Sequence, residues 1–272
     1  MTTDTVEPAA PQAASPLAAP PGARPAIVIH RVSNDRPWVW LAAGWKDLMA
    51  APHIGFFYGS AVVGLSWLLV VMLLQFGSGW AVLPAVAGFF LVGPIIGAGL
   101  YETSRRRERG EPVSLGIAFA AYKRNAPQLA IMGAALVLIN LFWVRIAGLL
   151  FMVFFGLGFS PAIEALPAAL LRSNQLLPFL IVGTGFGFVL ATAAFAISAV
   201  SIPMILDRDI SAVEAIVTSI RATFDNWRAM AFWAGLIVVF TGMALVPFFL
   251  GIALVLPLVG HATWHAYRDI VR

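Results

Sequence analysis

The 272-residue chain is 60% hydrophobic and 11% charged, with a formal net charge of +4. A soluble domain carries roughly a quarter charged residues to cover its surface, so this composition excludes an ordinary soluble protein and indicates an integral membrane protein. The chain contains no cysteine, which excludes disulfides, iron–sulfur clusters and thiolate chemistry. Because the cations border apolar segments, the positive charge indicates contact with anionic lipid headgroups, and no nucleic-acid partner is expected.

The N-terminal segment differs from the rest of the chain. Residues 1–27 are rich in Ala and Pro and lack the basic start and apolar stretch of a secretory signal. We expect a disordered cytoplasmic tail there, followed by a single integral membrane domain over residues 28–272. Asn34–Pro37 is typical of a helix start, and Pro52 ends this helix. The residues at helical spacing on one apolar face are Trp38, Leu41, Trp45, Leu48 and Met49. The helix is too short to span, so we place it in the membrane interface with its tryptophans toward lipid.

Two apolar segments then form a predicted hairpin. Residues 54–75 are long enough for a hydrocarbon core of roughly 30 Å, and residues 80–102 return after the turn Phe76–Gly79. Four arginines follow at the membrane surface: Arg105, Arg106, Arg107 and Arg109. They predict contact with anionic lipid headgroups.

A second unit of the same kind follows. Residues Ser114–Tyr122 carry an apolar stripe at helical spacing, and Asn125–Pro127 ends this short helix. Residues 129–150 and 177–205 are the next two predicted spans. The region 146–176 is ambiguous, and we interpret it as the end of a span followed by a long external loop with a short interfacial helix.

The third unit begins with a capping box, in which Ser211 caps a helix and Glu214 reaches back. The nearly uncharged stretch 229–265 is too long for one span. We interpret it as two spans, 229–245 and 247–265, with a turn near Thr241–Pro247; one long kinked helix is the alternative.

The sequence thus predicts an all-α polytopic membrane protein with six transmembrane helices in three hairpins, each preceded by a short amphipathic cytoplasmic interfacial helix. The segments Pro94–Gly97 and Pro257–Gly260, each followed at equal spacing by an aromatic residue and an arginine, suggest an internal repeat. Only Arg145 and Arg172 of the 17 Lys and Arg fall on the predicted external side. The positive-inside rule therefore puts both termini in the cytoplasm of a bacterium, with the protein in the inner (plasma) membrane.

Four motifs carry a resemblance to a family. They are Trp40–Asp47, Gly93-Pro94 with Gly99-Leu-Tyr101, Ser201–Arg208, and Pro257–Trp264 with Tyr267-Arg268. Together they cover roughly residues 30–272, and the chain resembles the bacterial integral membrane proteins called domain of unknown function 2189. The resemblance implies six spans, and some members carry the label of putative cytochrome c oxidase subunit. The family supplies no established activity and no catalytic residues.

Three histidines are the candidate cofactor ligands: His53, His261 and His265. The last two are one helical turn apart, and imidazoles at one depth suit a metal or haem. Histidines at a membrane boundary more commonly bond water, backbone or headgroups, so no cofactor and no metal is expected. An oxidase catalytic subunit needs histidines deep in several spans, and this chain has none there.

Small residues at four-residue spacing permit close approach of helices. The pairs are Gly55 with Gly59, Ser60 with Gly64, and Gly93 with Gly97. Internal packing between spans is favoured, and self-association in a homo-oligomer is the alternative.

The leading hypothesis is a non-catalytic structural, accessory or assembly protein that packs with other membrane proteins, and one version of this role is related to a respiratory oxidase. The alternative is a transporter or channel for a small neutral or apolar molecule, because deep charges typical of proton pathways are missing from the predicted spans. An enzyme is the third possibility and would use the region of Tyr101, Glu102, His261 and His265. No catalytic residue is assigned.

Overall fold

The computed structural model describes residues 27–159 and 165–272; the predicted tail lies almost entirely outside this part of the chain. The described residues are helical apart from turns and one isolated antiparallel bridge between Ile29 and Val271, which confirms the predicted all-α class. The α-helices are α1 Arg36–Ala50, α2 Pro52–Gln75, α3 Val82–Ile96, α4 Ala98–Glu108, α5 Leu115–Ala120, α6 Ala126–Phe155, α7 Leu166–Leu171, α8 Leu176–Ser198, α9 Ser201–Asp207, α10 Ala212–Asp225, α11 Trp227–Leu245 and α12 Ile252–Ile270. Two 3₁₀ turns, η1 Gly79–Ala81 and η2 Ala121–Lys123, precede α3 and follow α5.

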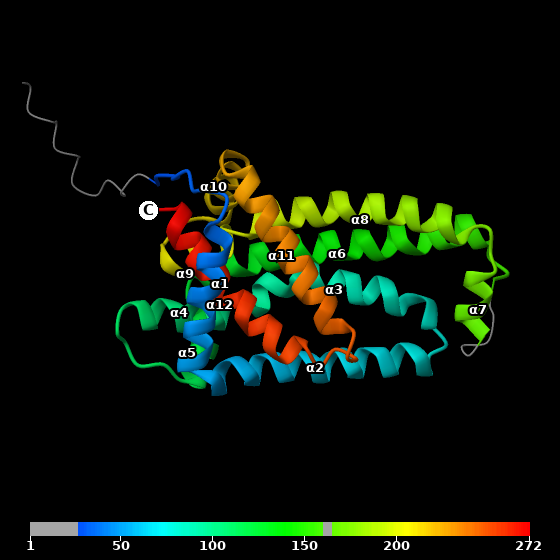
Figure 1. Ribbon diagram of the computed structural model, residues 1–272, viewed down its shortest axis with the longest axis horizontal. Helices are drawn as coiled ribbons and strands as arrows, with labels where there is room; N and C mark the ends of the chain where they lie inside the picture. Colours follow the sequence, from blue (N-terminus) through cyan, green and yellow to red (C-terminus); the bar gives the residue numbers. More distant parts are fainter. Residues whose placement is uncertain (1–26, 160–164) are drawn as a thin grey trace, which may run out of the picture.

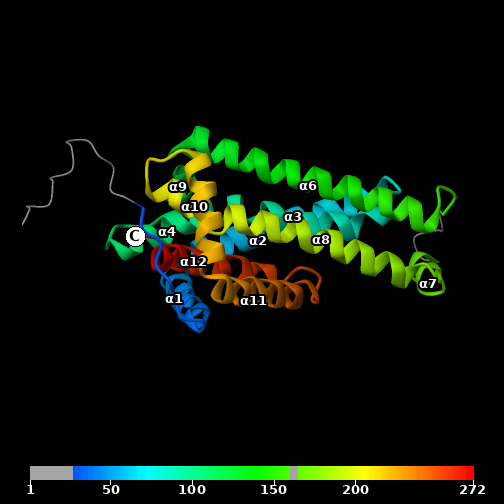
Figure 2. The same ribbon diagram turned by 90° about the horizontal axis from the view of Figure 1, so that it is seen from above.

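The long helices α2, α6 and α8 run along the long axis of the molecule, with α3 beside them (Figures 1 and 2). The short helices α1, α4, α5, α9 and α10 gather with the C-terminus at one end, which we call the polar end. The opposite end, which carries α7, is called the far end. The molecule is therefore an elongated bundle whose two ends differ in structure.

Four helical stretches are long and apolar enough to cross a membrane, and this confirms a multi-pass protein. They are Pro52–Gln75, Ala126–Phe155, Leu176–Asp207 and Trp227–Leu245. At 1.5 Å per residue the first is about 36 Å long, more than a hydrocarbon core of roughly 30 Å. The other two predicted spans are shorter than expected. The predicted span 80–102 divides into α3 and α4 at Gly97, and the predicted span 247–265 begins only at Ile252, in α12.

Local sequence signals place several helix ends where they are expected. The oxygen of Ser211 accepts a hydrogen bond from the Glu214 N–H at 3.2 Å and caps α10. Ser114 caps α5 in the same way. Asn125 takes a left-handed conformation, φ 45°, and separates η2 from α6. Asparagine is one of the few non-glycine residues that tolerates this conformation, so it suits the corner.

The stretch 229–265 contains two helices, as the two-span interpretation predicts. The turn lies over residues 246–251, later than expected, because α11 continues to Leu245. Phe248 and Phe249 reverse the chain there with φ of 50° and 67°, a strained conformation for bulky residues. The Trp67 Nε1–H donates to the Phe248 carbonyl oxygen at 3.1 Å. Trp67 lies about two turns before the end of α2, so the α11–α12 hairpin stops short of the far end.

The exposed and buried faces of α1 differ from the prediction. Trp38, Trp45 and Met49 are exposed, but Leu41 and Leu48 are buried. The buried face also includes Trp40, which is 1% exposed and packs edge-on against Trp233 with ring centroids 5.9 Å apart. α12 packs along α1, so the buried residues of α1 are those that face α12 and recur every three or four positions.

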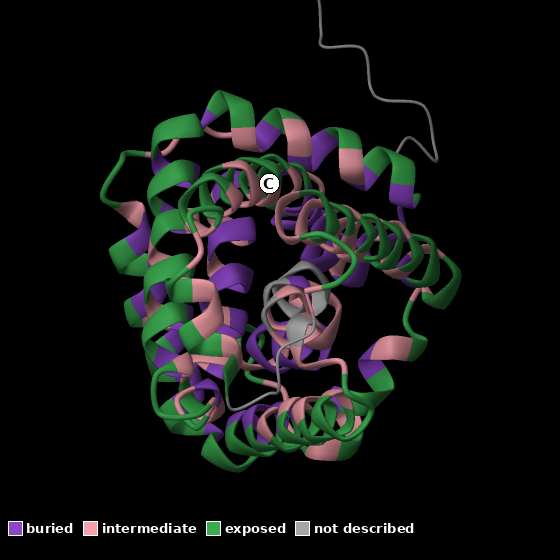
Figure 3. Ribbon diagram, turned by 90° about the vertical axis from the view of Figure 1, so that its right-hand side faces the viewer, coloured by how far each residue is buried: buried purple, intermediate pink, exposed green. Residues whose placement is uncertain are grey.

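The well-packed core lies at the polar end. The largest fully buried side chains there are Trp40, Trp233, Trp264, Tyr267, Leu100 and Met204. By contrast, only 11% of the most apolar window of α6 is buried, so its side chains must face lipid. Figure 3, seen from the far end, shows exposed residues on the outward faces of the helices around the bundle.

Candidate functional site

The buried charged residues gather at the polar end, where α4, α9 and α12 meet under α1. We call this set the polar cluster. Its members are Asp47, Glu102, Ser104, Arg105, Arg107, Asp207, His261, His265 and Tyr267. Buried charges are stable only when they are paired and hydrogen-bonded, so the partners of each one define what the site can do.

Glu102 is the centre of one part of the polar cluster. Its carboxylate accepts hydrogen bonds from the Nε and Nη2 of Arg105 at 2.7 and 2.8 Å and from the Nε of Arg106 at 2.9 Å. Arg124 lies 3.8 Å away. Glu102 and Arg105 are 2% and 3% exposed, so both charges are withdrawn from solvent. Spacings of three and four residues put these groups on one face of α4, which makes the pairing local.

Asp47 joins three helices. Its Oδ1 accepts from the Nε of Arg107 in α4 at 2.9 Å, and its Oδ2 lies 2.8 Å from the Nε2 of His265 in α12. Burial alone raises the pKa of the Asp47 carboxyl, but the hydrogen bonds from His265 and its neighbours outweigh this effect and lower the pKa to about 2. Asp47 is therefore ionised and acts as an acceptor, and His265 donates its Nε2–H.

His261 has a different partner. Its Nδ1 is hydrogen-bonded to the Ser104 hydroxyl at 2.8 Å, and both side chains are 0% exposed. The Nε2 of His261 is buried and has no hydrogen-bond partner among the described residues. This serine–histidine pair resembles half of a nucleophilic site, but complete burial leaves no path for a substrate to reach the hydroxyl.

Asp207, at the end of α9, completes the polar cluster. It accepts a hydrogen bond from the Tyr267 hydroxyl at 2.9 Å and from Arg109 at 3.1 Å, and Arg268 lies 3.5 Å away. The Nε of Arg208 donates to the same Tyr267 oxygen at 3.2 Å. These bonds connect α4, α9 and α12 at their ends.

A further ion pair fixes α1 to the C-terminus. Arg36 donates two hydrogen bonds to Asp269 at 2.7 and 2.8 Å, and the Trp40 indole donates a third at 2.9 Å. Chemically, the arrangement pairs each carboxylate of the polar cluster with cations, which come from the same helix for Glu102 and from other segments for Asp47 and Asp207. It can hold helix ends together, and it leaves no carboxylate of the polar cluster without a cationic partner.

The four arginines expected at the lipid surface are distributed over these pairs. Arg105 is buried against Glu102, whereas Arg106, Arg107 and Arg109 are partly exposed and also bound to carboxylates. Contact with headgroups remains a proposal for the last three. Sequence reasoning missed the acidic partners Asp47 and Asp207 because they come from distant segments. The pairing of Glu102 with Arg105 could have been predicted, because the two residues are three positions apart on one helix.

The three candidate histidines do not meet at one point. His53 is exposed, His261 contacts Ser104, and His265 contacts Asp47. Within residues 27–159 and 165–272 there is no group of three or more His, Asp or Glu side chains arranged to hold a metal ion.

The candidate packing residues divide into two groups. A side chain added at Gly59 would meet the Ala253 backbone, and one added at Gly55 would meet Leu48 and Pro257, so these glycines allow α2 to approach α12. Gly97 lies against Tyr101. Gly64 and Gly93 face open space, and Ser60 is exposed, so these three have no close neighbour helix within the described residues.

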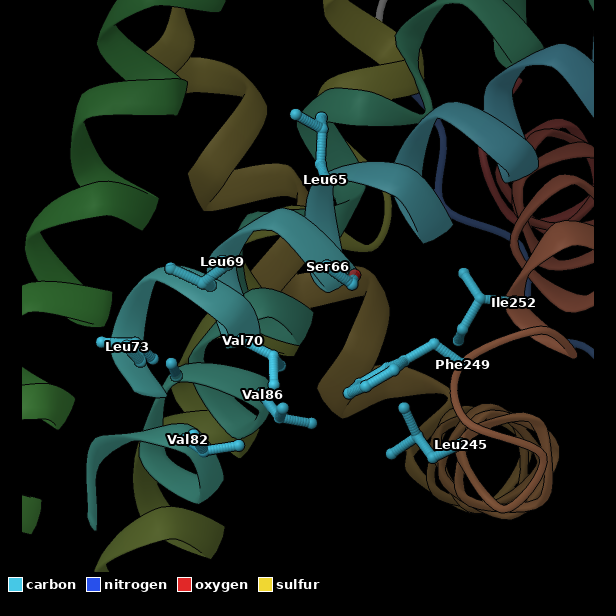
Figure 4. A pocket seen from close by; sticks show the side chains of 11 residues that line it. Leu65, Ser66, Leu69, Val70, Leu73, Val82, Val86, Leu245, Phe249 and Ile252 are labelled. Atoms are coloured by element: carbon cyan, nitrogen blue, oxygen red, sulfur yellow. The ribbon is translucent and has the colours of Figure 1, made fainter. Parts of the chain in front are cut away.

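An apolar cavity of about 110 Å³ lies nearer the far end, between α2, the start of α3 and the α11–α12 turn. Figure 4 shows the side chains of Leu69, Val86, Leu245 and Phe249 around it. It exists where the short α11–α12 hairpin leaves the side of α2 uncovered. Its lining carries almost no polar group, so it suits an apolar occupant.

The fold and site define an integral, multi-pass membrane protein whose charged residues serve mainly to join helix ends. Residues 82–207 match the family described as "Predicted integral membrane protein (DUF2189)". Over that range the chain is similar to this family, which confirms the resemblance that its motifs indicate. Gly93-Pro94 and most of the Ser201–Arg208 segment lie inside the matched range, whereas Trp40–Asp47 and Pro257–Trp264 lie outside it. No curated protein and no solved structure matches the chain.

Proposed function

We propose that the chain crosses a bacterial inner membrane six times, as three hairpins. Four helices support this by length and composition, and α3 and α12 run between or beside them. α3 continues into α4 after Gly97, so together they are long enough to pass from the far end to the polar end. α12 has an apolar first half and a polar second half that ends in the polar cluster.

The proposed orientation has the polar end in the cytoplasm. Nearly all Lys and Arg of the described chain lie at this end, and the positive-inside rule assigns such an end to the cytoplasm. The helices α1, α5 and α10 precede the hairpins and would lie in the interface. Their recurrence before each pair of long helices supports the proposed internal repeat.

The proposed role is that of a non-catalytic structural, accessory or assembly protein that packs with other membrane proteins. The proposed role rests on the outward face of α8. Gly185 is exposed and has no neighbouring atom within 4 Å of the place where a side chain would begin, so a partner helix can approach the backbone closely there. A respiratory oxidase is one class of partner, suggested by the label that some family members carry.

The test is extraction of the protein from native membranes in polymer nanodiscs, followed by mass spectrometry with quantified stoichiometry. We expect one membrane protein or complex in fixed ratio, and we expect Gly185→Leu to lose it. Gly64→Leu on α2, also in open space, is the matched control and should keep the partner. Recovery of the wild-type protein alone, or equal loss in both variants, would contradict the proposal.

The apolar cavity supports the second candidate function, transport of a small neutral or apolar molecule. A cavity of about 110 Å³ is close in size to those that hold benzene or xenon in other proteins. Xenon binding detected by NMR should be abolished by Leu69→Trp, which fills the cavity. A transport role also requires flux across vesicles, and unchanged flux in Leu69→Trp would exclude this cavity as the path.

A further inference from the structure

A second, polar cavity of about 120 Å³ lies at the polar end, between the N-terminal segment and the corner that joins α10 to α11. Arg31 comes from the first segment, and Asp225, Asn226, Trp227 and Arg228 come from the second. Two arginines that are distant in sequence therefore line one small space.

Asn226 builds this site. It is 5% exposed, its Oδ1 accepts a hydrogen bond from the Val32 N–H at 2.8 Å, and its Nδ2 donates to the His30 carbonyl at 3.0 Å. The residues on both sides of Arg31 are thus fixed to the α10–α11 corner. The bridge between Ile29 and Val271 holds the same segment from the other side. The fold therefore fixes the backbone position of Arg31 beside the cavity.

The hydrogen bonds of Asn226 leave the first N–H groups of α11 without a side-chain acceptor. The Asn226 oxygen is used by Val32, and α11 has no side-chain cap. The first N–H groups of a helix have no acceptor within the helix, so those of Trp227, Arg228 and Ala229 point out of its start with a partial positive charge. All three residues line the cavity.

Among the described residues, Arg31 and Arg228 lack an acidic partner, unlike seven other arginines of the polar end. Within the described part of the chain, neither Arg31 nor Arg228 forms an ion pair, although Asp225 also lines the cavity. The Arg228 guanidinium lies 5.2 Å from the centre of the Trp227 ring. The arginines with carboxylate partners are Arg36, Arg105, Arg106, Arg107, Arg109, Arg124 and Arg268.

The cavity also lies at the depth of a membrane surface. α11 is one of the four helices able to cross a membrane, and it starts at Trp227, which is 60% exposed. Beside it, the exposed Trp38 packs edge-on against Phe232 with ring centroids 5.7 Å apart. Exposed tryptophans at a helix end are typical of the level at which phospholipid phosphates lie.

We propose that this cavity binds the phosphate of an anionic phospholipid. Arg31 and Arg228 hold the phosphate oxygens from two sides, and the open N–H groups of α11 complete the set of donors. The acyl chains then follow the apolar surface of α11 below Trp227. This site differs from the arginine run Arg105–Arg109, whose charges are occupied within the protein.

The test measures binding of individual lipids to the purified full-length protein by native mass spectrometry in detergent, with phosphatidylglycerol, phosphatidylcholine and inorganic phosphate as separate probes. We expect phosphatidylglycerol to bind more tightly than phosphatidylcholine. Arg31→Gln and Arg228→Gln should each weaken phosphatidylglycerol binding about fivefold, because an arginine near an anionic lipid contributes about that factor. Arg221→Gln is the matched control, since Arg221 is exposed, lies on α10 and does not line the cavity.

The outcomes separate the site from general surface charge. Weakening in the two cavity variants with an unchanged control supports the proposal. Equal weakening in Arg221→Gln, or unchanged affinity in the cavity variants, overturns it. Inorganic phosphate that binds as tightly as the lipid, and with the same dependence on Arg31 and Arg228, would overturn the lipid assignment in favour of a soluble phosphate ligand. Circular dichroism of each variant confirms that a lost signal is not lost folding.

Discussion

Replacement of Glu102 by glutamine is the sharpest test of the polar cluster. Glu102 is 2% exposed and accepts three hydrogen bonds from two arginines, one of which, Arg105, is 3% exposed. Glu102→Gln removes the negative charge and leaves the Arg105 guanidinium buried without its counter-ion. Loss of one member of a buried ion pair costs about 3–5 kcal/mol, because the remaining charge keeps its desolvation penalty.

The matched control is Glu111→Gln. Glu111 pairs with Arg106 at 3.4 Å, but its side chain is 38% exposed, and an exposed pair of this kind contributes about 0–1 kcal/mol. A double variant, Glu102→Leu with Arg105→Met, removes both buried charges together. It should recover much of the stability lost in Glu102→Gln, because apolar side chains of similar volume do not need a partner.

Stability is measured as the free energy of unfolding in mixed micelles of increasing SDS content, followed by tryptophan fluorescence. We expect Glu102→Gln to be much less stable than Glu111→Gln, with the double variant between it and the wild type. If Glu102→Gln and Glu111→Gln lose the same small amount, the Glu102–Arg105 pair is not buried as described and the reasoning fails.

Two further predictions follow from other contacts. Gly59→Ala should destabilise the protein, because its new methyl group meets the Ala253 backbone. Gly64→Ala is the control and should be neutral or slightly stabilising, because Gly64 faces open space. Equal unfolding curves for the two variants would refute close α2–α12 packing. The folded-state pKa of Asp47, about 2, lies below its ordinary 3.8, so this carboxylate contributes stability that is fully present above pH 3.8 and is lost as the pH falls toward 2. That contribution is about 2 kcal/mol, and the Asp47→Asn variant should lack it; an acid titration of unfolding that is identical in both proteins would contradict the assignment.

The sequence predicted much of the helical architecture, because long apolar runs and cap residues are local signals. Ser211 caps its helix as expected, and the predicted division of 229–265 into two helices is confirmed. The position of that turn was displaced because the reversal uses Phe248 and Phe249 in a left-handed conformation, which no propensity scale favours for phenylalanine.

The polar cluster was predictable only in part. Glu102 and Arg105 are three residues apart on one helix, so their pairing follows from spacing. Asp47 and Arg107 are 60 positions apart, and Asp47 and His265 are 218 apart, so their contact depends on how α1 crosses α4 and α12. No periodicity within one segment contains that information. The burial of Leu41 and Leu48 of α1 was not predicted for the same reason.

The central claim is the arrangement of three hairpins with the polar end in the cytoplasm, and single-cysteine labelling tests it most directly. The chain contains no cysteine, so each introduced thiol is the only one present. A membrane-impermeant maleimide applied to intact spheroplasts should label cysteine at Ser78 and Ser173, in the turns of the first two hairpins. It should label cysteine at Ser211 only after the membrane is permeabilised. Labelling of the Ser211 variant from outside, or protection of the Ser78 or Ser173 variant until permeabilisation, would contradict the account.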